Sequence, residues 1–221
     1  MTTCYMCDQR ATTVEHAPPK CIFPEKKDVP SGKDYRKDLV TVPSCELHNT
    51  ATSRDDEYLL YMLSASITSS DVGLNQFLTK VKRAAERSPA LASSMLVSSD
   101  PVKIFHEDTQ EWKDAYGIQV QGNRLDLVFK KIASALYFHE KKVQFNGEIK
   151  VVTGFTLYSE PSTNAAIASA VPAAEDFFSS HEPKGSNPDI FFYRFGEGPG
   201  SAIMLMNFYG TSKVLIKYEP R

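Results

Sequence analysis

The feature that most constrains this chain of 221 residues is the spacing of soft metal ligands near its start. Cys4 and Cys7 are separated by two residues, and Cys45 and His48 repeat that spacing later in the same stretch. A CxxC pair suits a tight knuckle and a CxxH pair suits the first turn of a helix, so the four side chains can converge on one tetrahedral ion. The spacing predicts a zinc site. Because four protein ligands leave no open coordination position, we expect the Zn²⁺ to be structural.

Residues with oxygen donors and a basic imidazole lie beside these soft ligands. Glu15 and His16 lie between the two ligand pairs, and Asn49 directly follows the last ligand. Carboxylate and amide oxygens suit Mg²⁺ or Mn²⁺. An imidazole that titrates near neutral pH is the usual general base for deprotonating water in phosphodiester hydrolysis. The pattern therefore favours a second, catalytic metal beside the structural one, with Glu15 and Asn49 as its ligands.

The segments that carry these residues, EHAPPK and DLVTVPSCELHN, resemble the HNH endonuclease family of the ββα-metal, treble-clef type. In that family a CxxC knuckle leads into a strand that ends in Asp/Glu–His before a proline-containing loop, and a later segment ending in CxxC-Asn opens a helix. The resemblance covers roughly the first quarter of the chain. It implies an N-terminal, zinc-bound treble-clef ββα module that hydrolyses phosphodiester bonds in nucleic acid.

The resemblance also implies a role for each residue. His16 would be the general base, while Glu15 and Asn49 would hold the catalytic Mg²⁺ or Mn²⁺. Asp38 stands at the middle position of the motif, where the family name expects Asn, and it is counted with the catalytic residues. His48 stands where the family more often has a cysteine, a replacement that zinc tolerates. Phage defence and restriction are the biological contexts that the resemblance suggests.

Two interpretations of this stretch remain open, because zinc sites with such spacing are more often structural modules than enzymes. A metal-dependent nuclease needs Glu15, His16 and Asn49, whereas a noncatalytic zinc-bearing interaction or regulatory protein needs none of them. Their joint presence favours the nuclease. Cys21 lacks a partner at knuckle spacing, so we expect it to pack as a small apolar residue.

The composition of the chain limits where the protein is expected to be located and which partners it is expected to bind. The chain has no apolar run of membrane-spanning length and no signal-peptide pattern, and the zinc would use three of its four cysteines, so we expect a soluble, cytoplasmic protein. A net charge of −2 is unusual for a nonspecific DNA-binding protein. DNA, the expected substrate, would have to be held by local basic patches or with a protein partner. One active site cuts one strand per engagement, so double-strand cleavage would imply a homodimer or a second binding event.

The middle of the chain is predicted to be a charged loop followed by helices. Residues 24–38 form the loop, whose cations could be solvated or could touch a phosphate backbone. Ser53 to Asp56 form a capping-box pattern, which predicts a helix start and explains the acids there more simply than a metal site does. Helical spacing then predicts two apolar stripes, first at Leu59, Met62, Leu63 and Ile67, and then at Leu74, Phe77, Leu78, Val81 and Ala85. The second helix is expected to end at Ser88-Pro89, and its polar side carries Lys80, Lys82, Arg83 and Arg87, a solvated face by default with DNA contact as the alternative.

From residue 100 onward the pattern is that of a mixed α+β domain with a largely antiparallel sheet. Strands are predicted at 102–105, 116–121 and 149–158, the last after a hairpin turn at Asn146-Gly147. A helix capped by Asn123 and ending near His139 buries Leu125, Val128, Phe129, Ile132, Ala133 and Leu136. Another helix is predicted at 163–180, bent at Pro172, and three final strands at 190–195, 202–208 and 214–218.

The expected fold class is therefore α+β with three parts. Residues 1–60 form the zinc-binding nuclease module, 61–99 a helical connector, and 100–221 a domain for substrate selection or assembly. Gly196 to Gly200 lie between two strands, so we expect a hairpin loop and not a phosphate-binding loop. His106, His139 and His181 are isolated from any nucleophile or carboxylate in the sequence and are expected to be structural or surface residues.

Overall fold

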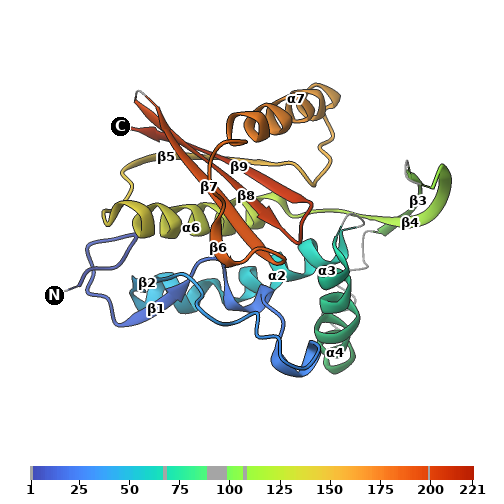
Figure 1. Ribbon diagram of the computed structural model, residues 1–221, viewed down its shortest axis with the longest axis horizontal. Helices are drawn as coiled ribbons and strands as arrows, with labels where there is room; N and C mark the ends of the chain where they lie inside the picture. The colour runs from blue at the N-terminus through green and yellow to red at the C-terminus, as the bar shows by residue number, and fades with distance from the viewer. Residues whose placement is uncertain (1, 67–68, 89–98, 107–108, 199) are drawn as a thin grey trace.

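The computed structural model describes residues 2–66, 69–88, 99–106, 109–198 and 200–221 (Figure 1). Its N-terminal part contains β1 (Thr13–His16), β2 (Thr41–Ser44), α1 (Glu46–Asn49), η3 (Thr50–Thr52) and α2 (Ser53–Ala65). β1 and β2 are antiparallel, with Glu15 opposite Val42 and His16 opposite Thr41. The short α1 follows β2 directly, so the chain has the ββα order expected from the sequence.

A loop and a helical segment complete the N-terminal half. The loop between β1 and β2 contains two short turns, η1 (Lys20–Ile22) and η2 (Lys26–Asp28). The helical segment runs through α3 (Asp71–Gln76), the π-helical turn η4 (Phe77–Val81) and α4 (Lys82–Arg87). It lies against the loop (Figure 1), so the loop is supported along one side by a helix.

The C-terminal half is built on a five-stranded antiparallel sheet in the order β5-β9-β8-β7-β6. Its strands are β5 (Gly147–Thr153), β6 (Lys184–Asn187), β7 (Phe191–Gly198), β8 (Ser201–Phe208) and β9 (Ser212–Pro220). The helix α6 (Gly122–Lys141) lies between this sheet and the N-terminal elements, and it contacts β5, β2 and α2 (Figure 1). The helix α7 (Pro161–Phe177) packs on the opposite side of the sheet (Figure 1).

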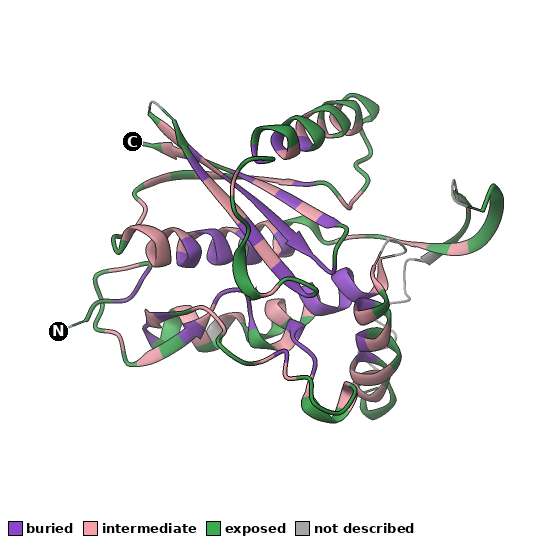
Figure 2. Cartoon of the chain, viewed as in Figure 1, coloured by how far each residue is buried: buried purple, intermediate pink, exposed green. Residues whose placement is uncertain are grey.

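One continuous hydrophobic cluster joins the two halves. It includes Cys4 and Tyr5 near the N-terminus, Phe129 and Leu136 on α6, and Tyr218 on β9. Figure 2 shows the buried residues concentrated on the inner strands, α6 and α2. The cluster crosses the boundaries that we expected after residues 60 and 99, because α6 presents apolar side chains to both halves. The division into three parts stays an expectation.

A two-stranded antiparallel hairpin stands away from this body (Figure 1). It consists of β3 (Ser99–His106) and β4 (Glu111–Ile118). Phe105 and Trp112 are directly opposite each other, and their ring centroids are 5.4 Å apart. Both rings are exposed, so they are not part of the core.

Several predicted elements are confirmed. The six inward positions predicted on α6 are all buried, and β7, β8 and β9 correspond to the three predicted final strands, with β7 beginning one residue later than expected. β7 and β8 form the expected hairpin, but Gly196 to Gly198 belong to β7 and pair with β8, so the strand extends further into the glycine-rich segment than predicted. α7 contains Pro172 within its length. α2 begins at Ser53 and buries Leu59, Met62 and Leu63, while Ile67 and any helix after Pro89 lie outside the described residues.

Several local predictions are wrong in whole or in part. Asn146-Gly147 does not form a hairpin, because it links α6 to β5, whose partner β9 comes from the end of the chain; β5 ends at Thr153 and not at residue 158. The helix starts at Ser53 as predicted, but Ser53 does not cap it, because the turn η3 precedes it and Ser53 already has helical backbone angles; Thr52 occupies the N-cap position and makes no side-chain cap. In the second helical stripe only Val81 is buried, and Leu78 is 57% exposed. On the side predicted to be solvated, Lys80 and Arg83 contact the loop, whereas Lys82 and Arg87 are exposed as expected.

Candidate metal centre and neighbouring polar site

The four predicted zinc ligands converge at the start of the chain. Cys4, Cys7, Cys45 and His48 place their ligand atoms within 4.8 Å of one another, and no other group of three or more His, Cys, Asp or Glu residues in the described part of the chain does so. Cys4 and Cys7 come from the knuckle before β1, Cys45 follows β2, and His48 lies on α1. Cys21 is outside the cluster, where its thiol donates to the Asp56 carbonyl oxygen at 3.3 Å, so its predicted non-ligand role holds.

The distances within the cluster fit a tetrahedral ion. The Sγ atoms of Cys7 and Cys45 are 3.8 Å apart, and His48 Nδ1 lies 3.3 Å from Cys45 Sγ and 3.5 Å from the other two sulfurs. Zn–S bonds of about 2.3 Å and a Zn–N bond of about 2.0 Å at tetrahedral angles require edges of roughly 3.8 and 3.5 Å. The donor set therefore fits Zn²⁺, with Nδ1 as the histidine ligand atom.

The electrostatics of Cys4 also suit a metal ligand. Burial alone would raise the pKa of the Cys4 thiol, but hydrogen bonds from the Met6 and Cys45 backbone and from His48 outweigh it and lower that pKa to about 6. For Cys7, a backbone hydrogen bond from Gln9 lowers the pKa, yet burial and the neighbouring thiols raise it above its usual value. Thiolates are the form that binds zinc. One thiol of the cluster is thus already biased towards the thiolate form.

A hydrogen bond links α1 to the strand that carries Glu15 and His16. Asn49 is the last residue of α1, and its Nδ2 donates to the carbonyl oxygen of Val14 at 3.3 Å. That carbonyl belongs to the peptide that joins Val14 to Glu15 in β1. The hydrogen bond therefore ties the end of α1 to β1 next to the Glu15-His16 pair, and leaves the side-chain oxygen of Asn49 as the atom that a cation could bind.

Glu15 points into the protein. It is only 4% exposed, and its Oε1 lies 3.3 Å from the ammonium group of Lys131 on α6. Its other oxygen, Oε2, is buried without a hydrogen-bond partner among the described residues. Burial raises the pKa of Glu15 to about 7; Lys131 opposes this shift and Asp56 adds to it. Oxygen ligands are preferred by Mg²⁺ and Mn²⁺, so this unpartnered oxygen fits a hard cation.

His16 and Asp38 lie in different surroundings. His16 is half-buried, and its pKa is lowered by burial and by the nearby charges of Lys20 and Arg36. Asp38 is exposed, with a left-handed backbone (φ 53°), and the ion pair of its carboxylate is with Lys37 at 3.9 Å. Its backbone carbonyl accepts a hydrogen bond from the hydroxyl of Ser186 on β6. The contacts of the Asp38 side chain do not bring it to Glu15, His16 or Asn49.

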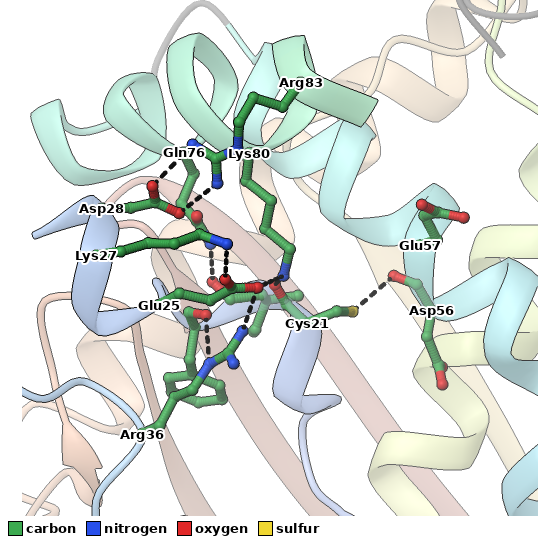
Figure 3. A network of polar contacts seen from close by, with 12 residues as sticks. Cys21, Glu25, Lys27, Asp28, Arg36, Asp56, Glu57, Gln76, Lys80 and Arg83 are labelled. Atoms are coloured by element: carbon green, nitrogen blue, oxygen red, sulfur yellow. Dashed lines mark hydrogen bonds and ion pairs between the residues drawn. The ribbon is translucent and has the colours of Figure 1, made fainter. Parts of the chain in front are cut away.

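The basic residues of the β1–β2 loop and of the helical segment α3 to α4 form ion pairs and hydrogen bonds with the loop (Figure 3). Arg83 holds Asp28 with two hydrogen bonds of 2.7 and 2.8 Å, and Lys80 donates to the Cys21 carbonyl at 2.8 Å. Lys27 and Arg36 both pair with Glu25. These basic residues hold the loop in place, which favours a structural role over phosphate contact for them.

Sequence reasoning missed the polar residues that surround Glu15. Lys131 donates to Thr52 Oγ1 at 2.7 Å and to both carboxylate oxygens of Asp56, at 2.8 and 3.0 Å. A lysine within the apolar stripe of α6 was the available signal, because position 131 lies between Val128 and Ala135 on the buried side. Gln144, which contacts the zinc knuckle, had no comparable signal.

Comparisons with known proteins add no relative. No family model, no curated protein and no solved structure matches this chain. Among the described helices, none combines the length and apolar character needed to cross a bilayer.

Proposed function

We propose that this protein is a metal-dependent endonuclease of the HNH type, with nucleic acid, in particular DNA, as its substrate. One observation carries the proposal: the zinc-ligand cluster lies on the same hairpin and helix as the Glu15-His16 pair, and Asn49 is hydrogen-bonded to the peptide that precedes Glu15. A zinc scaffold alone requires none of these three residues. A cytoplasmic location and a role in phage defence or restriction are part of the proposal.

His16 would act as the general base. A base must be neutral to accept a proton from water, and burial together with the charges of Lys20 and Arg36 lowers the pKa of His16. The imidazole is therefore available in its neutral form at physiological pH. Lys20 is exposed and four residues away in the chain, so its charge could also meet a phosphate group.

Glu15 Oε2 and the side-chain oxygen of Asn49 would hold the catalytic Mg²⁺ or Mn²⁺. Such an ion supplies charge stabilisation to the phosphate and the leaving oxygen. Glu15 would be oriented from its other side by Lys131, which contacts Oε1. Asp38 is not assigned a role in this arrangement, because its carboxylate pairs with Lys37 on the surface.

A cleavage assay tests the proposal. Zinc-loaded protein is incubated with supercoiled plasmid and with single-stranded DNA, with and without Mn²⁺ or Mg²⁺. His16→Ala is the test variant, and His139→Ala is a matched control, because His139 is also half-buried with a pKa lowered by burial but lies on α6. We expect cleavage by the wild type and the control, and a rate about 100- to 10,000-fold lower for His16→Ala.

A second function is a noncatalytic zinc-bearing interaction protein. The observation that favours it is the pairing of buried Glu15 with Lys131, because this contact gives the carboxylate a structural partner without any metal. If the wild type cleaves neither the plasmid nor the single-stranded DNA, with or without Mn²⁺ or Mg²⁺, this alternative is supported and the nuclease is rejected.

A further inference from the structure

The zinc knuckle is held by a residue from the other half of the chain. The side-chain amide of Gln144 donates to the carbonyl oxygen of Cys4 at 2.7 Å and to that of Cys7 at 2.9 Å. A glutamine amide has two N–H donors, so one can serve each carbonyl. The two carbonyls belong to the first and last residues of the CxxC knuckle. Gln144 therefore spans the knuckle and ties both of its ends to one point.

That point is itself anchored. Gln144 lies in the short connection between α6 and β5. On one side, Lys142 closes α6 in a left-handed conformation (φ 59°), with its N–H bonded to the Phe138 carbonyl. On the other side, the Phe145 ring packs against Tyr137 and Tyr218, with ring centroids 5.0 Å away in each case. Gln144 is thus flanked on both sides by residues that are fixed to the C-terminal half by a helix cap and by ring packing.

We infer that Gln144 is a positioning residue for the metal centre, through which the C-terminal half of the chain keeps the zinc knuckle closed. The two thiolates of a CxxC knuckle converge only when its backbone is tightly turned, and Gln144 removes freedom from that turn in advance of metal binding. Partners beyond the ligands themselves commonly change metal affinity about 10- to 100-fold. The inference concerns zinc retention and does not depend on nuclease activity.

Zinc affinity tests the inference on the full chain. The zinc-loaded protein is equilibrated with a chromophoric chelator, and the zinc dissociation constant is measured by competition. Gln144→Met keeps the side-chain length and removes both donors, so we expect zinc binding to weaken roughly 10- to 100-fold. Co²⁺ substitution provides a second readout, because its visible spectrum reports whether the tetrahedral sulfur-rich geometry persists. A Gln144→Met protein with wild-type zinc affinity would overturn the inference.

Two further variants separate positioning from general damage. Asn164→Leu removes another amide that makes two backbone hydrogen bonds, to the N–H and the carbonyl of Tyr158 at 2.9 and 2.8 Å, far from the knuckle in the chain. We expect it to keep wild-type zinc affinity. Gln144→Lys restores a donor of similar reach, and it should recover most of the affinity lost in Gln144→Met. Equal loss in Gln144→Lys and Gln144→Met would rule out donation to the carbonyls as the cause, and a wild-type chain that binds no zinc would refute the metal centre itself.

Discussion

The ammonium group of Lys131 lies 3.3 Å from the Glu15 carboxylate and 2.8 Å from that of Asp56, so one buried cation joins β1, α2 and α6. Two carboxylates share this single ammonium group. An unpaired buried charge is costly, so each member of the cluster depends on the others. Through Lys131, the candidate catalytic hairpin is connected to the helix on which the C-terminal sheet packs.

Removing Lys131 should therefore destabilise the whole chain. We expect Lys131→Met to lower the free energy of unfolding by about 3–5 kcal/mol, because it leaves two buried carboxylates without a cation. Arg124→Met is the control: Arg124 pairs with Asp55 across the same two helices, but both side chains are about 30% exposed, so its loss should cost no more than about 1 kcal/mol. Urea denaturation of the two variants measures the difference, and equal losses would contradict the prediction.

Zinc content should follow the assigned ligands. The wild-type chain is expected to carry one zinc ion, and Cys7→Ser or Cys45→Ser should lose it and unfold the N-terminal elements. Cys21→Ser should keep the metal, because its thiol lies outside the cluster and bonds to a backbone carbonyl. Elemental analysis of the purified proteins provides the measurement. Wild-type zinc content in Cys45→Ser would show that the cluster is not the metal site.

Replacing Asn49 should affect the proposed catalytic metal but not the proposed structural zinc. Asn49→Ala is expected to retain zinc, because the residue is not in the zinc cluster, and to weaken Mn²⁺- or Mg²⁺-dependent cleavage. Zinc content and cleavage at several Mn²⁺ concentrations are measured on the same preparation. If the variant loses zinc, the assignment of separate roles to Asn49 and the zinc ligands is wrong.

The cleavage rate should rise with pH in the acidic range. The neutral form of His16 is the active one, and burial followed by the charges of Lys20 and Arg36 lowers its pKa below the usual value of 6.5. The rising limb should therefore lie below pH 6.5, and loss of His16 should reduce the rate about 100- to 10,000-fold. A pH–rate profile of the wild type at saturating Mn²⁺ is the test, because bound metal keeps Glu15 ionised although burial raises its pKa to about 7. A rising limb centred well above pH 6.5 would point to another base.

The pairing of Asp28 with Arg83 should make the loop sensitive to acid. Hydrogen bonds from Arg83 lower the pKa of Asp28, despite the opposing effect of burial, so the folded state favours the carboxylate. This stabilisation is present above the usual aspartate pKa and is lost as pH falls through the lower folded pKa. We expect Arg83→Met to lower the melting temperature at pH 7 and to have a smaller effect at pH 3. An effect that is equal at both pH values would argue against the ion pair as its source.

Much of the local structure was predictable from spacing and periodicity. The convergence of Cys4, Cys7, Cys45 and His48 was predicted from two pairs with the spacing of metal ligands, and the structure brings the four residues together. The buried face of α6 followed from the 3.6-residue period, and the final three strands from their β-branched and aromatic runs. The period failed for α3 to α4, where a polar face packs on the loop through Gln76 and Lys80.

Long-range polar partners could not be predicted in the same way. Glu15 was expected to hold a divalent cation, and nothing in the sequence indicated that its Oε1 would lie against Lys131, more than a hundred positions away, or that Gln144 would reach the Cys4–Cys7 knuckle over a similar separation. Periodicity indicates which face of an element is apolar, but it carries no information on which buried polar groups will meet. The ligand spacing, the ββα order and the amphipathic α6 were thus encoded locally. Only the packing of α6 between the hairpin and the sheet decided the surroundings of Glu15 and the support of the zinc knuckle, because hydrogen bonds and ion pairs form between whichever groups the tertiary contacts bring together.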